Sequence, residues 1–190
     1  MTDRPMLFQS DMVRAILDGR KTMMRRACKG VALDWLTNAG FAPEFVGNRK
    51  NKLCPHGNVG DRIWVRESWQ AWAECDKLKA ALLQNDVRLR LNYPANGNTW
   101  PNRVRPSIHM PRWASRITLA IIGVRVERLQ DISRGDAMAE GCPFPNMAQG
   151  QDPRNWYAKL WDSINSSGSW TANPWVWCIE FKRITDEVNK

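Results

Sequence analysis

Four basic side chains gather in the short stretch GRKTMMRR, residues 19–26. Lys21 lies between Arg20 on one side and Arg25 and Arg26 on the other. Neighbouring like charges disfavour the protonated form of an ammonium group, so we predict a lowered pKa for Lys21. A lysine with a lowered pKa is a candidate base or electrostatic catalyst.

A carboxylate that could work with this lysine is Glu140, which ends a predicted short helix and precedes Gly141. Acidic side chains at such positions are most often solvated surface groups. From the residues alone we therefore interpret Glu140 as a surface carboxylate.

The sequence contains neither the donor set of a zinc site nor the motifs of common nucleophilic enzymes. Cys54 and His56 are two residues apart, but the chain has two histidines in all and no CxxC pair, whereas zinc needs four donors. We interpret residues 54–57, CPHG, as a turn, and we expect neither a metal nor another cofactor. GxSxG, Walker A and GxGxxG motifs do not occur.

A net charge of +9 and an acid-free span between Asp86 and Glu127 point to a polyanionic partner. Guanidinium groups bind phosphate bidentately and stack on bases, and Tyr93, Trp100 and Trp113 lie among the arginines. RNA, a nucleotide or a single-stranded nucleic acid is the predicted ligand; self-solvation of a basic chain is the alternative. The arginines of the span are Arg88, Arg90, Arg103, Arg105, Arg112, Arg116 and Arg125.

The sequence has no features of a membrane or secreted protein. The first ten residues, MTDRPMLFQS, contain no apolar signal segment, and no apolar run approaches the roughly 20 residues that span a bilayer. The five cysteines lack paired spacing, which favours reduced thiols. We therefore expect a cytoplasmic protein without a membrane partner.

Hydrophobic patterning predicts an α+β fold with a mainly antiparallel sheet, as in a small barrel. The expected order is helix, strands, short helix, helix, strand. A first helix is predicted at 11–18, capped by Ser10 and ended by Gly19. A second, short helix is predicted from Ser133 to Gly141, with Asp136 at the reciprocal capping position. A third is predicted to start at Asp152 and Pro153, and its inward-facing residues are Trp156, Leu160, Trp161 and Ile164. Strands are predicted at 62–69, 115–129 (with a bulge at Gly123) and 175–184.

The stretch 19–26 resembles the signature of ASCH-domain proteins, a branch of the PUA-like β-barrels. Gly19, Lys21 and Arg26 fit the pattern of that signature, and Met24 stands where the family has a glutamate. Further segments that resemble the family are GDRIWVRE, LQDISRGDAMAEG and NPWVWCIEF, and RPSIHMPRWASRI and WDSINSSGSWTANPWVW resemble the longer type common in phages and prophages. We expect one domain over 1–190, with insertions at about 28–55 and 70–105.

The resemblance implies a PUA-like barrel whose cleft, lined by the lysine motif, holds RNA or a nucleoside. Some members hydrolyse the amide of N4-acetylcytidine with a lysine, a threonine and a glutamate; others are described as ribonucleases without an obligatory metal. Carried over, the lysine is Lys21 and the glutamate is Glu140, which makes Glu140 a cleft residue. The threonine falls on Met24, which has no hydroxyl, and Thr22 is two positions away.

Three functions follow as alternatives: a module that binds RNA or a modified nucleoside, a nucleic-acid-directed hydrolase, and a phage accessory protein that acts through a protein partner. Lys21 and Glu140, with Thr22 as a weaker third, are the candidate catalytic residues. The candidate binding residues are Gly19, Arg20, Lys21, Arg25, Arg26, Arg103, Arg105, Arg112, Trp113 and Arg116.

Overall fold

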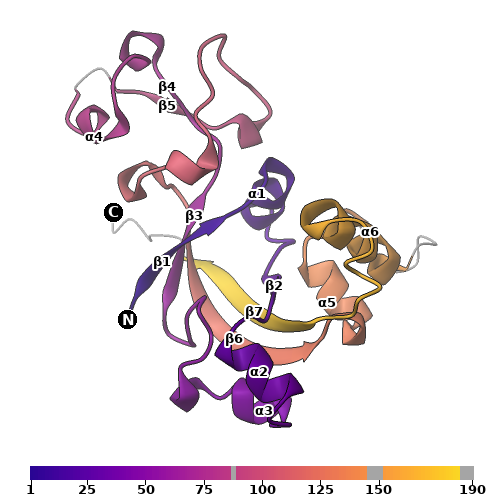
Figure 1. The fold of residues 1–190 in the computed structure, drawn as a ribbon. Helices are drawn as coiled ribbons and strands as arrows, with labels where there is room; N and C mark the ends of the chain where they lie inside the picture. The colour runs from indigo at the N-terminus through magenta and orange to yellow at the C-terminus, as the bar shows by residue number, and fades with distance from the viewer. Residues whose placement is uncertain (87–88, 145–151, 185–190) are drawn as a thin grey trace.

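A curved five-stranded sheet organises the fold, as the computed structural model of residues 1–86, 89–144 and 152–184 shows (Figure 1). The strands of this sheet follow the order β1-β3-β6-β7-β2. Their bounds are β1 Asp3–Leu7, β2 Met23–Ala27, β3 Arg62–Arg66, β6 Thr118–Arg128 and β7 Trp175–Ile184; β4 Gln70–Ala71 and β5 Leu91–Asn92 form a separate pair.

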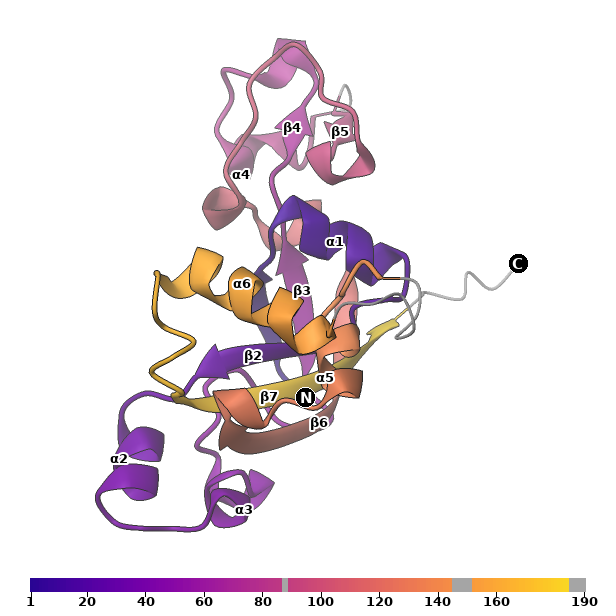
Figure 2. The same ribbon diagram turned by 90° about the vertical axis from the view of Figure 1, so that its right-hand side faces the viewer.

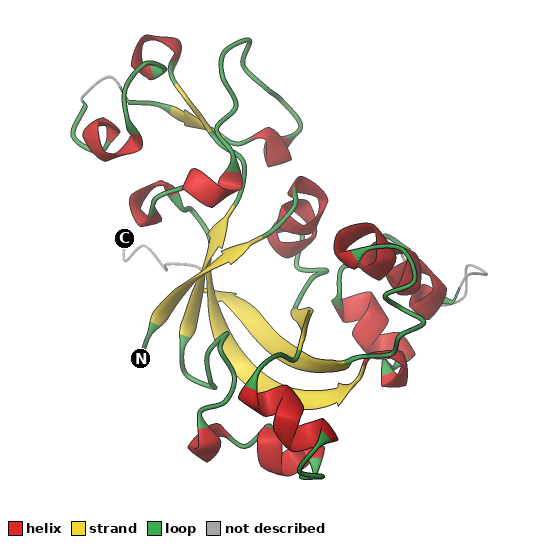
Figure 3. Ribbon diagram, viewed as in Figure 1, coloured by secondary structure: helices red, strands yellow, loops and turns green. Residues whose placement is uncertain are grey.

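Short helices and long loops surround the sheet (Figure 3). The α-helices are α1 Ser10–Leu17, α2 Val31–Thr37, α3 Pro43–Val46, α4 Ala80–Leu83, α5 Arg134–Ala139 and α6 Pro153–Asn165. Single 3₁₀ turns occupy Arg49–Asn51, Ala73–Cys75, Pro94–Asn96, Ser107–His109, Arg112–Ala114 and Leu129–Asp131. The α+β class with a mainly antiparallel sheet, predicted from the sequence, is confirmed.

Antiparallel pairing joins every neighbouring pair of strands in the main sheet except β1 and β3, which are parallel. A register shift between Ile121 and Gly123 interrupts the long β6–β7 ladder, at the glycine where the sequence predicted a bulge. Strands β1 and β2 are the two edges of the curved sheet. Arg26 of β2 donates to the carbonyl of Leu7 at the end of β1, and both residues line the groove described below.

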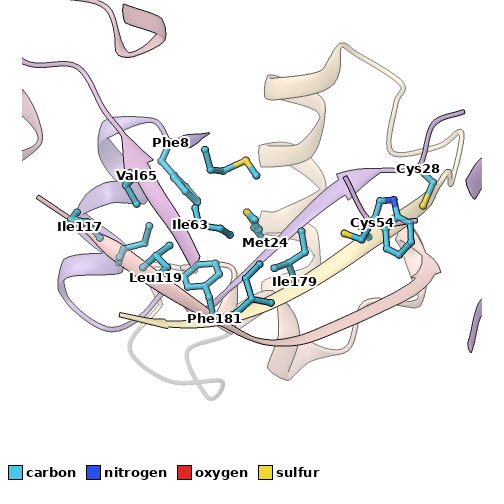
Figure 4. Packing of buried hydrophobic residues seen from close by; sticks show 14 of the residues in the cluster. Phe8, Met24, Cys28, Cys54, Ile63, Val65, Ile117, Leu119, Ile179 and Phe181 are labelled. Carbon is cyan, nitrogen blue, oxygen red and sulfur yellow. The ribbon is translucent and has the colours of Figure 1, made fainter. Parts of the chain in front are cut away.

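Apolar side chains fill the space inside the curve of the sheet. Trp177, Ile179 and Phe181 alternate along β7 and are buried together with Ile63 and Val65 of β3. Figure 4 shows Ile179 and Phe181 near Met24, Phe8 and Leu119 from other segments of the chain. A strand with period-two apolar residues buries one face in this way, which is why the patterns of β3 and β7 were readable from the sequence.

A second cluster covers the opposite face of β7. Val176 and Cys178, which alternate with the residues of the first core, pack against Tyr157 and Trp161 of α6. Figure 2 shows α5 and α6 on this side of the sheet, with α1 near α6. Both faces of β7 are therefore buried, and α6 is fixed close to the edge strand β2.

A third apolar cluster lies in the part of the chain between β3 and β6. Trp69, Cys75, Leu83 and Met110 are fully buried there, and the pair β4–β5 belongs to it. Figures 1 and 2 show this part projecting from the end of the sheet that carries β3. The interpretation of 28–55 and 70–105 as insertions in one domain stays a prediction.

Several local expectations need correction. The residue before α1 is Gln9, not Ser10, and it makes no side-chain cap. The Ser133 hydroxyl caps α5 as expected, but the Asp136 carboxylate turns to arginine side chains instead of closing a capping box. Asp152 caps α6, whereas Ile164 on that helix is exposed rather than inward. Strands β1 and β2 were not predicted.

The predicted CPHG turn is present: the Gly57 amide donates to the Cys54 carbonyl over 3.4 Å. Within 1–86, 89–144 and 152–184, no group of three or more His, Cys, Asp and Glu side chains is placed to hold a metal ion. In the same ranges no helix is long and apolar enough to span a bilayer.

Candidate binding groove between α1 and α6

Three adjoining hollows form a groove between α1 and α6. The inner pocket is narrow, with a volume of about 20 Å³ that holds about one water molecule, and has Lys21, Arg26 and Glu140 in its lining together with α6 side chains. It shares Met12 and Glu140 with a hollow of about 330 Å³ beside the end of α1. It also shares Met12 and Arg26 with a basin of about 560 Å³. We call these the inner pocket, the acidic hollow and the basin.

Lys21 is held rigidly at the floor of the groove. Its amide donates to the Ala15 carbonyl at 2.9 Å, and it forms an isolated β-bridge with Glu140. Its ammonium donates to the Met23 carbonyl at 2.8 Å, the Glu140 carbonyl at 2.9 Å and Glu140 Oε2 at 2.7 Å. An ammonium group has three N–H donors, so all of them have partners inside the protein.

The pKa of Lys21 is lowered, as the sequence predicted, but for a different main reason. Burial is the largest cause, because it removes the water that stabilises the charged form; the charges of Arg26 and Arg25 add to it. The carboxylate of Glu140 acts in the opposite direction and raises the pKa. Like-charge repulsion, the cause expected from the sequence, is a minor contribution.

Glu140 is a buried carboxylate between two cations, with 3% of its surface exposed. Its Oε2 accepts from Lys21 and its Oε1 accepts from Arg25 Nη1 at 3.1 Å. The interpretation of Glu140 as a surface carboxylate is therefore wrong; the residue is buried and lines the inner pocket, and the site role implied by the ASCH resemblance stays a prediction.

Gly141 permits the close approach of α5 to the lysine segment. Its φ is +99°, and a Cβ atom there would lie 3.0 Å from Ala15 Cβ and 3.2 Å from Lys21 Cβ. A glycine is required on both counts, since L-residues rarely adopt this φ and the neighbouring atoms leave no room. The Gly141 position thus allows Glu140 to reach Lys21.

Arg25 is the centre of a buried ion-pair network. Its side chain is fully buried and pairs with Glu140, with Glu127 at 2.7 Å and with Asp136 at 2.7 Å. Arg125 binds the same Glu127 and Asp136 and also Glu180. Arg25 is a predicted ligand contact, but its guanidinium is fully engaged inside the protein.

Arg26 differs from the other cations of the motif. Its guanidinium donates to the Arg25 and Leu7 carbonyls, each over 3.3 Å, and so spans from β2 to the end of β1. No carboxylate of the described residues forms an ion pair with it. The side chain lines both the inner pocket and the basin.

Aromatic and apolar side chains make up the walls of the inner pocket. Phe8 follows β1, while Tyr157 and Trp161 come from α6, and each is at least nine-tenths buried. Within the described residues, the indole N–H of Trp161 has no hydrogen-bond partner. Sequence reasoning placed Trp161 on the inner face of its helix but missed Phe8 and Tyr157, since nothing in the sequence links residue 8 to α6.

Of the remaining motif residues, Met24 lines the inner pocket and Gly19, Arg20 and Thr22 do not. Gly19 has a φ of +76° and makes the turn after α1. Arg20 lines the acidic hollow and binds Asp18 and the Gly141 carbonyl, each at 3.0 Å. Thr22 is exposed and does not line the pocket, whereas Met24 is buried and does.

The arginine span does not form one surface around the groove. Arg105 is buried and donates to the Cys75, Asp76 and Leu78 carbonyls. Arg116 makes a bidentate pair with the buried Glu67 at 2.9 and 3.0 Å and stacks on Tyr93. Arg105 through its Nη2 and Arg116 through its pair with Glu67 bind internal acceptors, which argues against the expectation that these two guanidiniums face a phosphate backbone.

The other residues predicted from that span lie on the projecting part or the outer sheet. Arg103 is exposed near Asp76. Arg112 lies over Trp64 and near Asp3. Trp113 packs edge-on against Trp69. None of them lines the groove, and Arg88 lies outside the described residues.

Comparison with known proteins adds a structural likeness only. The sequence matches no protein-family model and no curated protein. A high-resolution crystal structure of an ASCH domain from Lactobacillus crispatus JV V101 is similar, with a TM-score of 0.40 and 14% identity over 96% of this chain and 79% of that chain. A likeness at this level carries no argument about ligand or activity.

Removal of Arg25 tests the network. In Arg25→Leu the carboxylates of Glu127, Asp136 and Glu140 lose their shared cation, so we expect the free energy of unfolding to fall by about 3–5 kcal/mol. Urea unfolding followed by tryptophan fluorescence measures it. Arg183→Leu is the matched control, since Arg183 is exposed on β7 and binds one backbone carbonyl. Equal losses in both variants would contradict the assigned role.

The second prediction concerns how the stability of the fold depends on pH through the partly buried side chain of His56. Burial, together with Arg26 and Arg4, lowers the pKa of His56 to about 4, while the unfolded chain has the ordinary value of 6.5. Between these values the unfolded state binds the proton and the folded state does not, so stability falls as the pH decreases from 6.5 to 4. We expect His56→Gln to lose less stability than the unaltered protein between pH 7.5 and 4.5. The exposed His109 supplies the control, His109→Gln, which should behave like the unaltered protein.

Proposed function

We propose that this chain is an ASCH-like protein that binds RNA or a nucleoside in the groove between α1 and α6. The observation that carries the proposal is a single buried carboxylate, Glu140, held by two cations at the floor of an aromatic-walled pocket. The resemblance of residues 19–26 to the ASCH signature supports the same function.

Glu140 has acceptor capacity left for a ligand. A carboxylate offers about four lone-pair positions, and the hydrogen bonds from Lys21 and Arg25 use one on Oε2 and one on Oε1. Amino groups on the edges of cytosine, adenine or guanine are donors that match the remaining positions. Because Lys21 and Arg25 fix the carboxylate, a base edge would meet an acceptor that is already oriented.

Lys21 acts in this proposal by holding Glu140 rather than by contacting phosphate. Its three donors are engaged within the protein, so a phosphate contact would require one of those hydrogen bonds to break. The walls formed by Phe8, Tyr157 and Trp161 add apolar surface around the carboxylate, and each ring is at least nine-tenths buried. Binding thus combines one acceptor for a base edge with apolar walls.

Single-stranded RNA binding tests the proposal. Fluorescence anisotropy of a labelled oligonucleotide at 50 to 300 mM NaCl should show an affinity that falls with salt, by about 0.7 in logarithmic slope per phosphate contact. Loss of the base-edge contact in Glu140→Gln should weaken binding about tenfold without changing the slope, since a base contact contributes roughly 1–3 kcal/mol.

The control is Glu44→Gln, on the exposed surface of α3. Circular dichroism establishes that the variants are folded. An absence of binding at 50 mM NaCl, or an affinity independent of salt, would refute RNA binding. A protein retained from a lysate without nucleic acid would then favour the accessory role through a protein partner.

Hydrolysis is the second candidate, favoured by the buried Lys21–Glu140 pair and the lowered pKa of Lys21. In an amidohydrolase, water would attack the N4-acetyl carbonyl, Glu140 would take its proton and return it to the leaving amine, and Lys21 would stabilise the oxyanion. A ribonuclease would use the same pair without a metal. The missing hydroxyl counts against the amidohydrolase, because Met24 lines the pocket while Thr22 is exposed.

Acetate release from N4-acetylcytidine and cleavage of RNA separate these activities. If the chain is such an enzyme, Lys21→Met and Glu140→Gln should each reduce turnover at least a hundredfold, because each removes one group from the transition state. Met24→Thr should raise amidohydrolysis if only the hydroxyl is missing. Turnover that survives both substitutions would exclude these residues from the chemistry.

A further inference from the structure

The groove is electrostatically asymmetric, and Arg26 marks its basic end. Two other arginines line the groove outside the inner pocket, and both are paired with neighbouring carboxylates: Arg14 with Asp11 and Arg20 with Asp18. Arg26 forms no ion pair with a carboxylate of the described residues. Two of its N–H groups contact backbone carbonyls, which leaves three of its five donors for a ligand.

The basin beside Arg26 has the lining of an anion site. Its ten lining residues include no Asp or Glu. They do include hydroxyl and amide side chains that donate hydrogen bonds, namely Ser10, Ser68, Ser107, Gln9 and Asn165. Hydroxyl groups, amides and an arginine fork are the donors that commonly bind phosphate oxygens.

The acidic hollow, which adjoins the basin at Gln9 and Met12, disfavours a phosphate. The acidic hollow is lined by Asp11, Asp18 and Glu140, and its two arginines are those already paired there. A phosphate placed in this hollow would face three carboxylates. The cations near them are already bound to these carboxylates and are not available to the phosphate. Like charges at such distances repel, so an anionic group is directed away from this end.

The acidic hollow and the basin meet at Gln9 and Met12, which line both. Glu140 lines the acidic hollow and Arg26 lines the basin. One ligand that spans these two hollows can therefore lie beside the Glu140 carboxylate with one part and beside the Arg26 guanidinium with another. A nucleotide has this bipolar character, with amino groups on its base and negative charge on its phosphate.

We propose that the basin is a phosphate subsite centred on Arg26, so that the groove takes a nucleotide or an RNA phosphodiester in one direction, base toward Glu140 and phosphate toward Ser68 and Ser107. The inference rests on the proposed nucleic-acid function of the groove. A nucleoside, which has no phosphate, would leave the basin empty.

Matched ligands test the phosphate subsite. Calorimetric titration at 50 mM NaCl compares the four ribonucleosides, their 5′-monophosphates and dinucleotides with one phosphodiester. We expect the phosphate-bearing ligand to bind at least tenfold more tightly than the nucleoside of the same base. Arg26→Gln should remove that difference and leave nucleoside affinity within about twofold, while Arg26→Lys should retain part of it, because a lysine keeps the charge but loses the fork.

Arg183→Gln is the matched control, since its guanidinium also donates to a backbone carbonyl but lies outside the groove. Tighter binding of the monophosphate would identify a terminal phosphate as the ligand group; tighter binding of the dinucleotide would identify a phosphodiester. Equal affinity for nucleoside and nucleotide overturns the subsite alone. Loss of the phosphate preference in Arg20→Gln instead of Arg26→Gln reverses the direction and also overturns it. If no nucleoside, nucleotide or dinucleotide binds, the proposed function fails with it.

Discussion

The buried carboxylate of Glu140 is the constraint on which the groove depends. Placing a negative charge where 3% of the residue is exposed requires cations nearby, and Lys21 and Arg25 supply them from a different part of the chain. The two segments can meet only because Gly141 turns with a φ of +99° and leaves room for the Lys21 side chain. The end of α5 is thereby joined to the lysine segment that precedes β2.

The four cations of the 19–26 stretch have separate roles because their surroundings differ. Lys21 forms an ion pair with Glu140, and Arg25 forms ion pairs with Glu140 and its neighbouring carboxylates. Arg20 forms an ion pair with Asp18 at the surface. Arg26 alone among these four lacks a carboxylate partner in the described part of the chain. A count of positive charges would make the four equivalent, whereas pairing leaves one of them available to an anion.

Periodic patterns made β3, β6 and β7 predictable, because alternating apolar residues bury one face of a strand whatever its neighbours are. The segment MMRRA of β2 has no such alternation, and a buried arginine inside it is stable only through Glu127, Asp136 and Glu140, which lie more than 100 residues away. For the same reason, Arg105 and Arg116 were wrongly predicted to bind phosphate. Their acceptors are carbonyls and a carboxylate that composition cannot identify, so they resembled free phosphate ligands.

Stability alone gives little reason to bury this network. Desolvation of paired charges roughly cancels their attraction, so apolar side chains of similar volume often stabilise a protein as well or better. A fold that nevertheless encloses Lys21, Arg25 and Glu140 beneath an open groove gains a carboxylate of fixed orientation, with acceptor positions directed by its two cations. Such pre-organisation lowers the cost of ordering a site when a ligand arrives. The ion pairs are therefore better explained by the recognition proposed for the groove than by the stability of the sheet beneath it.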